Sequence, residues 1–327
     1  MRPVICFGEA LIDFLNFNNS QDGLLTLKEF RQYPGGAPAN AAVAVAKLGG
    51  KAQFAGQVGS DSFGDFLEDA LQQYGVDTSL LLRHATANTA LAFVMLDESG
   101  DRSFNFFRQN TADLLFAQSQ IDNSWFAHQA IVHFCSNTLT ESAIADCTLA
   151  LVKRAKQNDA LVSFDVNLRH NLWSSGAADI ALVNQLVMAS DIVKFSKDEL
   201  AYLAEDNQQQ YLQQCLASGV KLAIVTDAQG DIFVHTQQGQ FTVTPPTVHA
   251  VDTTAGGDAF IGALLFGLSV NQDSIIQNEQ ALGQLIQFAS HCGALAVTRL
   301  GAFPALPVFD EVAQQWPANM ALPTQTN

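Results

Sequence analysis

The middle of the chain alternates four short apolar runs, AIVHFC (130–135), LVSFD (161–165), DIVKF (191–195) and LAIVT (222–226), with longer helical stretches. The runs carry few charges and have the length of strands, whereas the stretches between them span ~10–18 residues. Apolar strands that alternate with helices are typical of a parallel sheet covered by helices on both faces. The sequence therefore predicts an α/β fold.

The same pattern continues toward the N-terminus. Val4–Phe7 is a further apolar run, and it ends at Gly8 as a buried strand would. Pro38 opens a helix of small residues that ends near Gly49, because proline suits the first helical turn and glycine suits the position past the end. Residues 61–74 are predicted to form a second helix.

Two excursions interrupt this pattern. A polar stretch from about Asn16 to Tyr33 lacks periodicity and is expected to be irregular. Ala90–Leu96 and Ser103–Arg108 are strand-like and rich in phenylalanine, and the turn-forming residues 97–101 lie between them. This arrangement predicts a β-hairpin.

The C-terminal part returns to regular elements. Ile232–His235 and Phe241–Thr244 are predicted to pair as a hairpin, and long helices are expected near 256–269 and 278–297. The tail from Pro317 has little apolar content and is expected to be frayed. The chain is therefore read as one α/β body without internal repeats.

Composition excludes several classes of protein. The 327 residues are 48% hydrophobic and 15% charged, which supplies a core and argues against disorder. The 16 Lys and Arg against 32 Asp and Glu give a net charge of −16, so nucleic acids and anionic membranes are not expected as partners. There is no signal-peptide pattern and no apolar run near the ~18 residues of a membrane helix. Five cysteines without a CxxC motif predict buried, reduced thiols in a cytoplasmic protein.

The stretch DTTAGGDAF (252–260) carries the strongest chemical signal. Its small residues lie where a loop becomes a helix, and the first N–H groups of a helix have no intrahelical partner and bind anions such as phosphate. Asp258 lies in this first turn. It is either a simple N-terminal acid that the helix dipole favours, or a base that takes a proton from a hydroxyl nucleophile, as phosphoryl transfer requires.

Other phosphate and cofactor motifs are absent from the sequence. It has no GxxxxGK[ST] loop and no GxGxxG, so a dehydrogenase of similar fold class is unsupported. GxSxG and HExxH are also missing, and the seven histidines show no metal spacing. Asp13 and Asp165 each follow or end a strand, where α/β proteins bind ligands.

The chain resembles the PfkB (ribokinase-like) family of carbohydrate kinases over essentially its whole length. GGAPAN (35–40) is similar to the family's N-terminal signature and DTTAGGDAF (252–260) to its C-terminal one, in the family's order. Features similar to the fructokinase branch are GEALID (8–13), FNFFR (104–108) followed by Ala112-Asp113, and DVNLR (165–169). Kinases of aminoimidazole riboside and of 2-keto-3-deoxygluconate share several of these features.

This resemblance implies the architecture. We expect a ribokinase-like three-layer α/β/α sandwich with a mostly parallel central sheet and a small β lid. One kinase domain would cover residues 1–316, with lid segments at about 15–34 and 88–110 and a tail at 317–327.

The resemblance also implies the sugar site. The sugar would be held by Asp13, Gly35, Gly36, Asn40, Arg108 from the lid, and Arg169, which could instead face the transferring phosphate. Asp258 would activate the primary hydroxyl of the sugar, and backbone amides of Ala255, Gly256, Gly257 and Asp258 would form the anion hole. Simpler readings are a turn for Gly35-Gly36, a helix-surface residue for Asn40, an exposed strand-edge charge for Arg108 and a loop ion pair for Arg169.

The nucleotide side departs further from the family. The family's Asn-x-x-Glu is Ser196-Lys197-Asp198-Glu199 here, and Glu199 would support Mg²⁺ through water. Lys194 would contact a phosphate or be a solvated strand-end charge. Thr226 would meet a nucleotide phosphate, although the usual Thr-x-Gly is Thr226-Asp227-Ala228, and Ser290 would lie near adenine.

A monovalent cation, K⁺, is implied beside the anion hole. Its ligands would correspond to Asp252, Thr254, Ala296, Arg299 and Gly301, several through backbone carbonyls. Ala305 lacks the side-chain oxygen that ribokinases use at the corresponding position.

The expected activity is phosphorylation of D-fructose to fructose 6-phosphate with ATP and Mg²⁺. Kinases of another small sugar or polyol, such as aminoimidazole riboside or 2-keto-3-deoxygluconate, are the alternative, and a non-catalytic sugar or nucleotide sensor is a third reading. Phe104, Phe106 and Phe107 of the lid would either pair two copies of the chain or close on the sugar.

Overall fold

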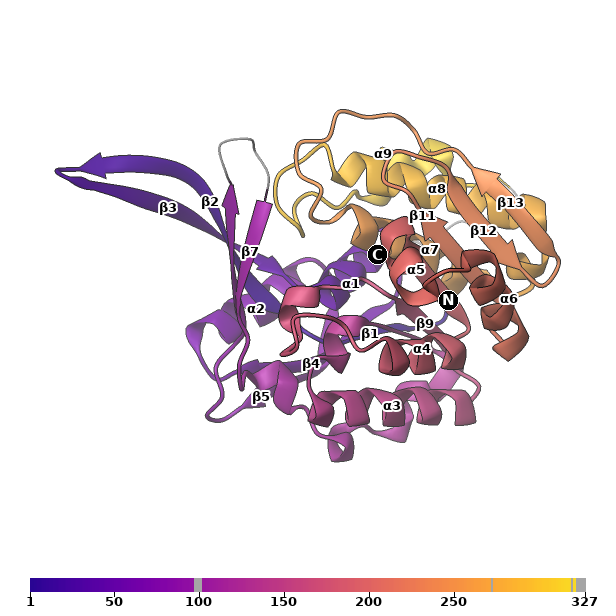
Figure 1. The fold of residues 1–327 in the computed structure, drawn as a ribbon, viewed down its shortest axis with the longest axis horizontal. Helices are drawn as coiled ribbons and strands as arrows, with labels where there is room; N and C mark the ends of the chain where they lie inside the picture. The colour runs from indigo at the N-terminus through magenta and orange to yellow at the C-terminus, as the bar shows by residue number, and fades with distance from the viewer. Residues whose placement is uncertain (97–101, 272, 319, 322–327) are drawn as a thin grey trace.

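The computed structural model describes residues 1–96, 102–271, 273–318 and 320–321. Its centre is a nine-stranded sheet in which the spatial order is β13-β12-β11-β10-β9-β8-β1-β4-β5 (Figure 1). The strands are β1 (Val4–Phe7), β4 (Ala52–Gly59), β5 (Asp77–His84), β8 (Ile131–Cys135), β9 (Leu161–Asp165), β10 (Ile192–Ser196), β11 (Leu222–Thr226), β12 (Ile232–Thr236) and β13 (Gly239–Val243). All neighbours from β5 to β11 pair in parallel, and only β11–β12 and β12–β13 are antiparallel.

Helices cover both faces of this sheet. One face packs against α1 (Ala37–Lys47), α2 (Ser62–Gln73), α7 (Gly256–Val270), α8 (Glu279–Ala296) and the short α9 (Phe309–Val312). The other packs against α3 (Ser142–Gln157), α4 (Ile180–Ala189), α5 (Lys197–Ala204) and α6 (Gln208–Ser218). Short 3-10 turns are η1 (Ala112–Leu115), η2 (Gln118–Gln120), η3 (Asn123–Gln129), η4 (Ser136–Leu139), η5 (His170–Leu172), η6 (Asp273–Gln277) and η7 (Ala313–Gln315).

The strand β1 shows why the expected three-layer sandwich forms. Val4 and Cys6 belong to the core under α1 and α7, whereas Ile5 and Phe7 belong to the core over α3 and α4. Successive side chains of a strand point to opposite faces, so a fully apolar run needs cover on both sides. The predicted α/β/α architecture is confirmed.

A second sheet forms the lid, with the order β3-β2-β6-β7. It consists of β2 (Leu11–Asp22), β3 (Leu25–Gly35), β6 (Leu91–Leu96) and β7 (Arg102–Phe107). The hairpin of β2 and β3 projects away from the body (Figure 1), and β6 pairs with β2 in parallel and with β7 antiparallel. The turn predicted at 97–101 lies outside the described residues.

One prediction for the lid was wrong. The stretch from Asn16 to Tyr33, expected to be irregular, is part of an antiparallel hairpin whose pairing runs from Leu11 opposite Gly35 to Asp22 opposite Leu25, with one register shift between Asn16 and Asn18. Its outer half is exposed on both faces, so its side chains carry no alternation between apolar and polar residues. Backbone pairing across the hairpin, rather than burial, organises it.

Three further expectations concern the rest of the chain. All five cysteines are free and buried, as predicted. No helix in the described part of the chain combines the length and the apolar character needed to cross a membrane. Pro317 and Met320 are buried, so the start of the tail expected to fray is packed, while 319 and 322–327 lie outside the described residues.

Candidate functional site

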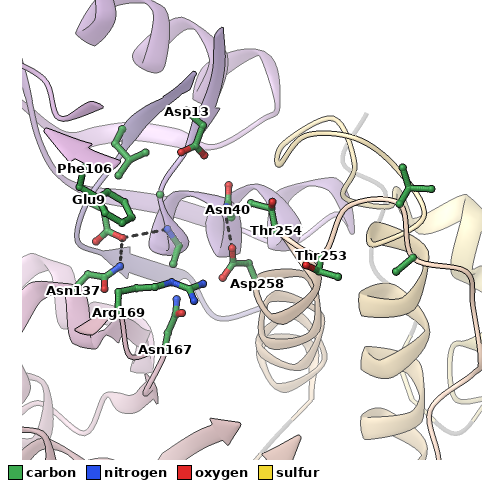
Figure 2. Close-up of a pocket in the computed structure, with 15 residues that line it drawn as sticks. Glu9, Asp13, Asn40, Phe106, Asn137, Asn167, Arg169, Thr253, Thr254 and Asp258 are labelled. Atoms are coloured by element: carbon green, nitrogen blue, oxygen red, sulfur yellow. Dashed lines mark hydrogen bonds between the residues drawn. The ribbon is translucent and has the colours of Figure 1, made fainter. Parts of the chain in front are cut away.

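A cavity of about 570 Å³ opens between the body and the lid (Figure 2). It lies where β1, β8 and β9 end and where α1 and α7 begin, which is where parallel α/β sheets bind ligands. Its lining comprises Glu9, Leu11, Asp13, Gly36, Ala37, Asn40, Phe106, Asn137, Asn167, Arg169, Ala250, Val251, Thr253, Thr254 and Asp258. The predicted sugar residues Asp13, Gly36, Asn40 and Arg169 are thus brought together with Asp258.

Asp258 lies buried in the first turn of α7. Its Oδ2 accepts a 2.7 Å hydrogen bond from Nδ2 of Asn40 in α1, which lies 218 residues away in the chain. Burial raises the pKa of Asp258 to about 7, although the hydrogen bond from Asn40 acts in the opposite direction. A carboxylate with a pKa near neutrality is suited to take a proton from a hydroxyl.

The pair Gly35-Gly36 shapes the wall under the lid. Gly36 precedes α1 with φ of 103°, and a Cβ there would collide with the carbonyl oxygen of Glu9. A Cβ on Gly35 would overlap the carboxylate of Asp13, which reaches from β2 toward it. The glycines therefore do more than turn the chain: Gly35, although not in the lining, leaves room for the Asp13 carboxylate, and Gly36 leaves room for the backbone of Glu9.

Arg108 does not take its expected place. It is neither in contact with the cavity nor an exposed strand-edge charge: it is buried just past β7, and its Nε donates to Asp113 Oδ2 at 2.6 Å. Its Nη1 donates to the carbonyl oxygen of Asn137 at 3.0 Å and to Thr140 Oγ1 at 3.3 Å. Burial alone would lower the pKa of Arg108, but the Asp113 carboxylate raises it, so this guanidinium is a buried structural cation behind the cavity.

The sequence-based prediction assigned no role to three polar lining residues, which are Glu9, Asn137 and Asn167, whereas Phe106, expected either to pair two copies or to close on the sugar, lies in the lining. Glu9 Oε1 accepts hydrogen bonds from Asn137 Nδ2 at 2.8 Å and from the backbone N–H of Ala37 at 3.3 Å. Burial raises the pKa of Glu9 above its usual range. Glu9 and Asn137 each follow the carboxyl end of a buried strand, and that position was the available signal.

A second cavity of about 280 Å³ lies on the other side of the start of α7. Its lining comprises Lys194, Thr226, Ala228, Gln229, Ile232, Pro245, Pro246, Val248, Ala250, Thr253, Gly256, Gly257, Phe260, Ser290, Gly293, Ala294 and Val297. The predicted nucleotide residues Lys194, Thr226 and Ser290 all belong to it. Ala250 and Thr253 line both cavities.

Lys194 is the buried cation of this second cavity. Its Nζ bonds both carboxylate oxygens of Asp165, at 2.9 and 3.1 Å, so the reading as a solvated charge was wrong. Burial alone would lower the pKa of Lys194, but Asp165 raises it. A Cβ placed on Gly257 would lie 3.5 Å from this Nζ, an ordinary contact distance, so the ammonium lies directly beside the first turn of α7.

The predicted anion hole follows the first turn of α7. Ala255 is the residue before the helix, and Gly256 and Gly257 line the second cavity while Asp258 lines the first. A Cβ on Gly256 would stand 2.6 Å from Val297 Cγ1, so close packing on the end of α8 requires glycine there. The first turn of α7 therefore lies at the junction of the two cavities, where the N–H of Gly256 donates weakly to the Thr253 carbonyl at 3.4 Å. The first N–H groups of a helix have no intrahelical acceptor.

Glu199 lines neither cavity and instead caps α5. Its Oε1 accepts from the backbone N–H of Leu168 and its Oε2 from that of Ser196, both at 2.7 Å. Ser196 Oγ in turn accepts from the N–H of Glu199, which completes a capping box. Glu199 therefore fixes the loop that carries Asn167 and Arg169.

The residues predicted to hold a monovalent cation come from two loops that lie together. Asp252 is buried, and its carboxylate accepts the N–H groups of Thr254 and Gly301, both at 2.9 Å. Ala296 is the last residue of α8, the loop after it contains Arg299 and Gly301, and the Arg299 side chain pairs with Glu311. Arg299 could therefore offer a cation only its backbone carbonyl.

A mostly parallel sheet, a β lid and two cavities that meet at a helix N-terminus define a small-molecule kinase of the ribokinase-like fold. Residues 1–308 match the family described as pfkB family carbohydrate kinase, and the chain belongs to this family. It is 38% identical over 316 residues to probable fructokinase-7 of Arabidopsis thaliana, covering 94% of this chain and 91% of the relative.

Solved structures agree with this assignment. A fructokinase with bound ATP from Xylella fastidiosa is 40% identical, with a TM-score of 0.89 over 96% of this chain and 97% of that one. A double mutant of fructokinase from Vibrio cholerae, in a form with fructose, ADP and potassium ion bound, is 35% identical with a TM-score of 0.85, covering 97% and 99%.

Proposed function

We propose that this carbohydrate kinase transfers the γ-phosphoryl group of ATP to the primary hydroxyl of D-fructose, giving D-fructose 6-phosphate and ADP. The observation that carries the proposal is the junction of the two cavities at the first turn of α7. Asp258 faces the polar cavity there, and Gly256 and Gly257 face the cavity that contains Lys194. The names of the similar fructokinases support the same substrate pair.

In this mechanism Asp258 takes the proton of the sugar hydroxyl while that oxygen forms its bond to the γ-phosphorus and the bond to the ADP oxygen breaks. Asn40 orients the carboxylate through its hydrogen bond to Oδ2. The amides of Ala255, Gly256 and Gly257 and the ammonium of Lys194 would stabilise the charge on the migrating phosphoryl group. Arg169, which lines the sugar cavity, would approach the same group from the other side.

The charge of the sugar cavity favours a neutral polyol. Glu9, Asp13 and Asp258 contribute carboxyl groups, and among the described lining residues Arg169 is the one cation. Arg108, which could have met an acidic sugar, is neutralised by Asp113. A carboxylate such as that of 2-keto-3-deoxygluconate would therefore be repelled.

Magnesium would accompany ATP as its phosphate-bound ion. The described residues contain no cluster of three or more His, Cys, Asp or Glu side chains that could hold a metal. That fits Mg²⁺, which is usually held by substrate phosphates, water and one or two carboxylates. Asp165, which pairs with Lys194 of the second cavity, would support it through water, and the ion would neutralise phosphate charge. Glu199, the residue expected in this role, has both carboxylate oxygens bonded to backbone N–H groups as the cap of α5.

K⁺ would bind between the loops that contain Asp252 and Gly301. The buried carboxylate of Asp252 supports this site, because it holds the two loops together beside the start of α7. Backbone carbonyl oxygens of these loops would be the ligands, since such oxygens suit a monovalent cation. Replacing K⁺ by tetramethylammonium should lower kcat, and Asp252→Asn should reduce the difference between the two salts. Equal rates in both salts would exclude this role.

Two expectations concern the setting of the enzyme. We expect a cytoplasmic location, which the free and buried state of the five cysteines supports. We also expect two copies to pair through the lid, because Phe17, Leu24 and Leu27 of the projecting hairpin and Phe107 of β7 are exposed. Phe17→Asp should shift a dimer to monomer in sedimentation, and a wild-type monomer would exclude the pairing.

The deciding assay couples ADP release to a sugar panel with ATP and Mg²⁺, with and without K⁺. Rapid ADP formation with fructose supports the proposal, and faster turnover of aminoimidazole riboside or 2-keto-3-deoxygluconate would replace it. Binding of a sugar without ADP formation would indicate a sensor.

A further inference from the structure

Three buried side-chain oxygens in the lining of the sugar cavity have no hydrogen-bond partner within the described part of the chain. They are Glu9 Oε2, Asn137 Oδ1 and Asn40 Oδ1. Asn40 lies beside Asp258, whereas Glu9 and Asn137 are bonded to each other. Figure 2 draws Glu9 and Asn137 together on one side of Arg169, and Asp258 on the other side.

A buried hydrogen-bond acceptor without a partner lowers the stability of the fold, because it has lost its hydrogen bonds to water and forms none within the protein. The bonded pair of Glu9 and Asn137 contributes two such acceptors. A ligand that satisfies both must carry two neighbouring donors, and the hydroxyls on adjacent carbons of a sugar are donors of this kind. The chemistry of the pair therefore matches a polyol rather than an anion.

Contacts behind the pair hold it in place before a sugar arrives. The N–H of Ala37, at the start of α1, donates to the same Oε1 of Glu9 that Asn137 bonds. Arg108 donates to the carbonyl oxygen of Asn137, and Asp113 fixes Arg108. These bonds use Glu9 Oε1 together with the amide nitrogen and the carbonyl of Asn137, and they leave Glu9 Oε2 and Asn137 Oδ1 without a partner among the described residues.

We propose that Glu9 and Asn137 form a subsite that binds hydroxyls of the sugar remote from the one that is phosphorylated, and that this subsite sets sugar specificity. The inference rests on the proposed function, because it assumes that the cavity binds a sugar. Glu9 is a binding residue in this scheme and takes no part in proton transfer. Arg108 is a positioning residue that acts through Asn137.

The test uses Glu9→Gln in the full chain. The glutamine oxygen can keep the bonds from Ala37 and Asn137, while its amide nitrogen puts a donor where Oε2 was an acceptor. We expect the KM for D-fructose to rise about tenfold or more, because a buried hydrogen bond is lost. The KM for ATP should change less than about twofold, because the second cavity is untouched.

Fructose analogues that each lack one hydroxyl identify the contact. The wild type should discriminate by about tenfold or more against the analogue that lacks the hydroxyl bound by Glu9, and Glu9→Gln should lose this discrimination. A purely structural role would not change this selectivity. Glu141→Gln, at an exposed glutamate before α3 that makes no capping hydrogen bond, is the matched control and should behave as wild type.

The outcomes separate this proposal from the proposed function. A folded Glu9→Gln variant with wild-type KM and selectivity would overturn the subsite, and if this variant does not fold, Asn137→Ala is judged by the same criteria. If the wild type forms no ADP with fructose, the proposed function fails, and calorimetry with the sugar panel decides the subsite. Weaker sugar binding by the variant supports it, whereas equal binding, or no binding by the wild type, overturns it.

Discussion

The two cavities on either side of the start of α7 have opposite kinds of lining. The larger one is lined by carboxyl groups and amides, among them Asp13, Asn40 and Asn137. The smaller one is lined mostly by apolar groups such as Pro245 and Val248, and Lys194 is its charged residue. A polyol needs many directed hydrogen bonds, whereas a flat base and its phosphates need apolar walls and a cation.

The two cavities also differ in the buried ion pair that lies behind each of them. A buried ion pair between Arg108 and Asp113 backs the sugar side, and one between Lys194 and Asp165 backs the nucleotide side. Arg108 lies outside the lining of the larger cavity, whereas Lys194 belongs to the lining of the smaller one. Variants on the two sides should therefore change different kinetic constants, and Asp258 at their junction should change the chemical step.

The largest effect is expected at the junction. Asp258→Asn should lower kcat by ~10²-fold or more, because loss of a general base usually costs 10²–10⁴-fold. The KM values for fructose and ATP should change far less, since Asn can still accept the hydrogen bond from Asn40. Steady-state kinetics with both substrates varied measures this, and near-normal turnover would remove Asp258 from catalysis.

The next effect tests the nucleotide side. Lys194→Met leaves the Asp165 carboxylate buried without its partner, and breaking such a pair costs about 3–5 kcal/mol of unfolding free energy. The KM for ATP should also rise more than the KM for fructose. Urea denaturation checks the stability, and the double variant Lys194→Met, Asp165→Leu should recover part of it. A stable single variant would contradict the role of the pair.

Variants of the larger cavity should change the KM for fructose more than the KM for ATP. Asp13→Ala should raise the KM for fructose by about tenfold or more, because hydrogen bonds to charged groups contribute about 1.5–3 kcal/mol. The KM for ATP should stay within about twofold. Steady-state kinetics provides the comparison, and a larger change in the ATP constant would show that the two cavities are not separate in function.

The pH dependence follows from the raised pKa of Asp258, about 7. The base works only when deprotonated, so kcat/KM for fructose should fall about tenfold per pH unit below 7. Because the folded pKa exceeds the unfolded value of 3.8, this group favours folding at low pH, and its contribution is lost as pH rises from about 4 to about 7.

Stability measurements check the same shift. Asp258→Asn should be more stable than the wild type at pH 8 and similar to it near pH 4, as judged by urea midpoints. A pH-independent difference between the two proteins would place the pKa elsewhere.

The smallest effect is expected at Lys197, which serves as the control for Lys194. Lys197 lies three residues further on and pairs with Asp227, but this lysine is exposed. Exposed ion pairs contribute little, so Lys197→Ala should leave the urea midpoint and both KM values unchanged. A measurable rise in the KM for ATP would extend the nucleotide site toward Asp227.

Sequence alone determined many elements of this protein and the chemistry of one helix end, but it did not predict β4, β5 or the hairpin of β2 and β3. The strands β1, β9 and β11 were placed at their observed bounds, because a buried strand is a local apolar run between breakers. The start of α7, with Asp258 in its first turn, was also predicted from the sequence, because small residues before an apolar helix form a local pattern.

The tertiary structure alone decided which polar groups meet. Glu9 and Asn137 are 128 residues apart and touch because β1 and β8 are neighbours in the sheet. Arg108 lies outside the cavity lining because it forms a buried ion pair with Asp113. Glu199 caps α5 because its carboxylate accepts hydrogen bonds from the backbone N–H groups of Leu168 and Ser196. Such choices depend on which partners the fold brings within hydrogen-bonding distance, and local periodicity does not encode those partners.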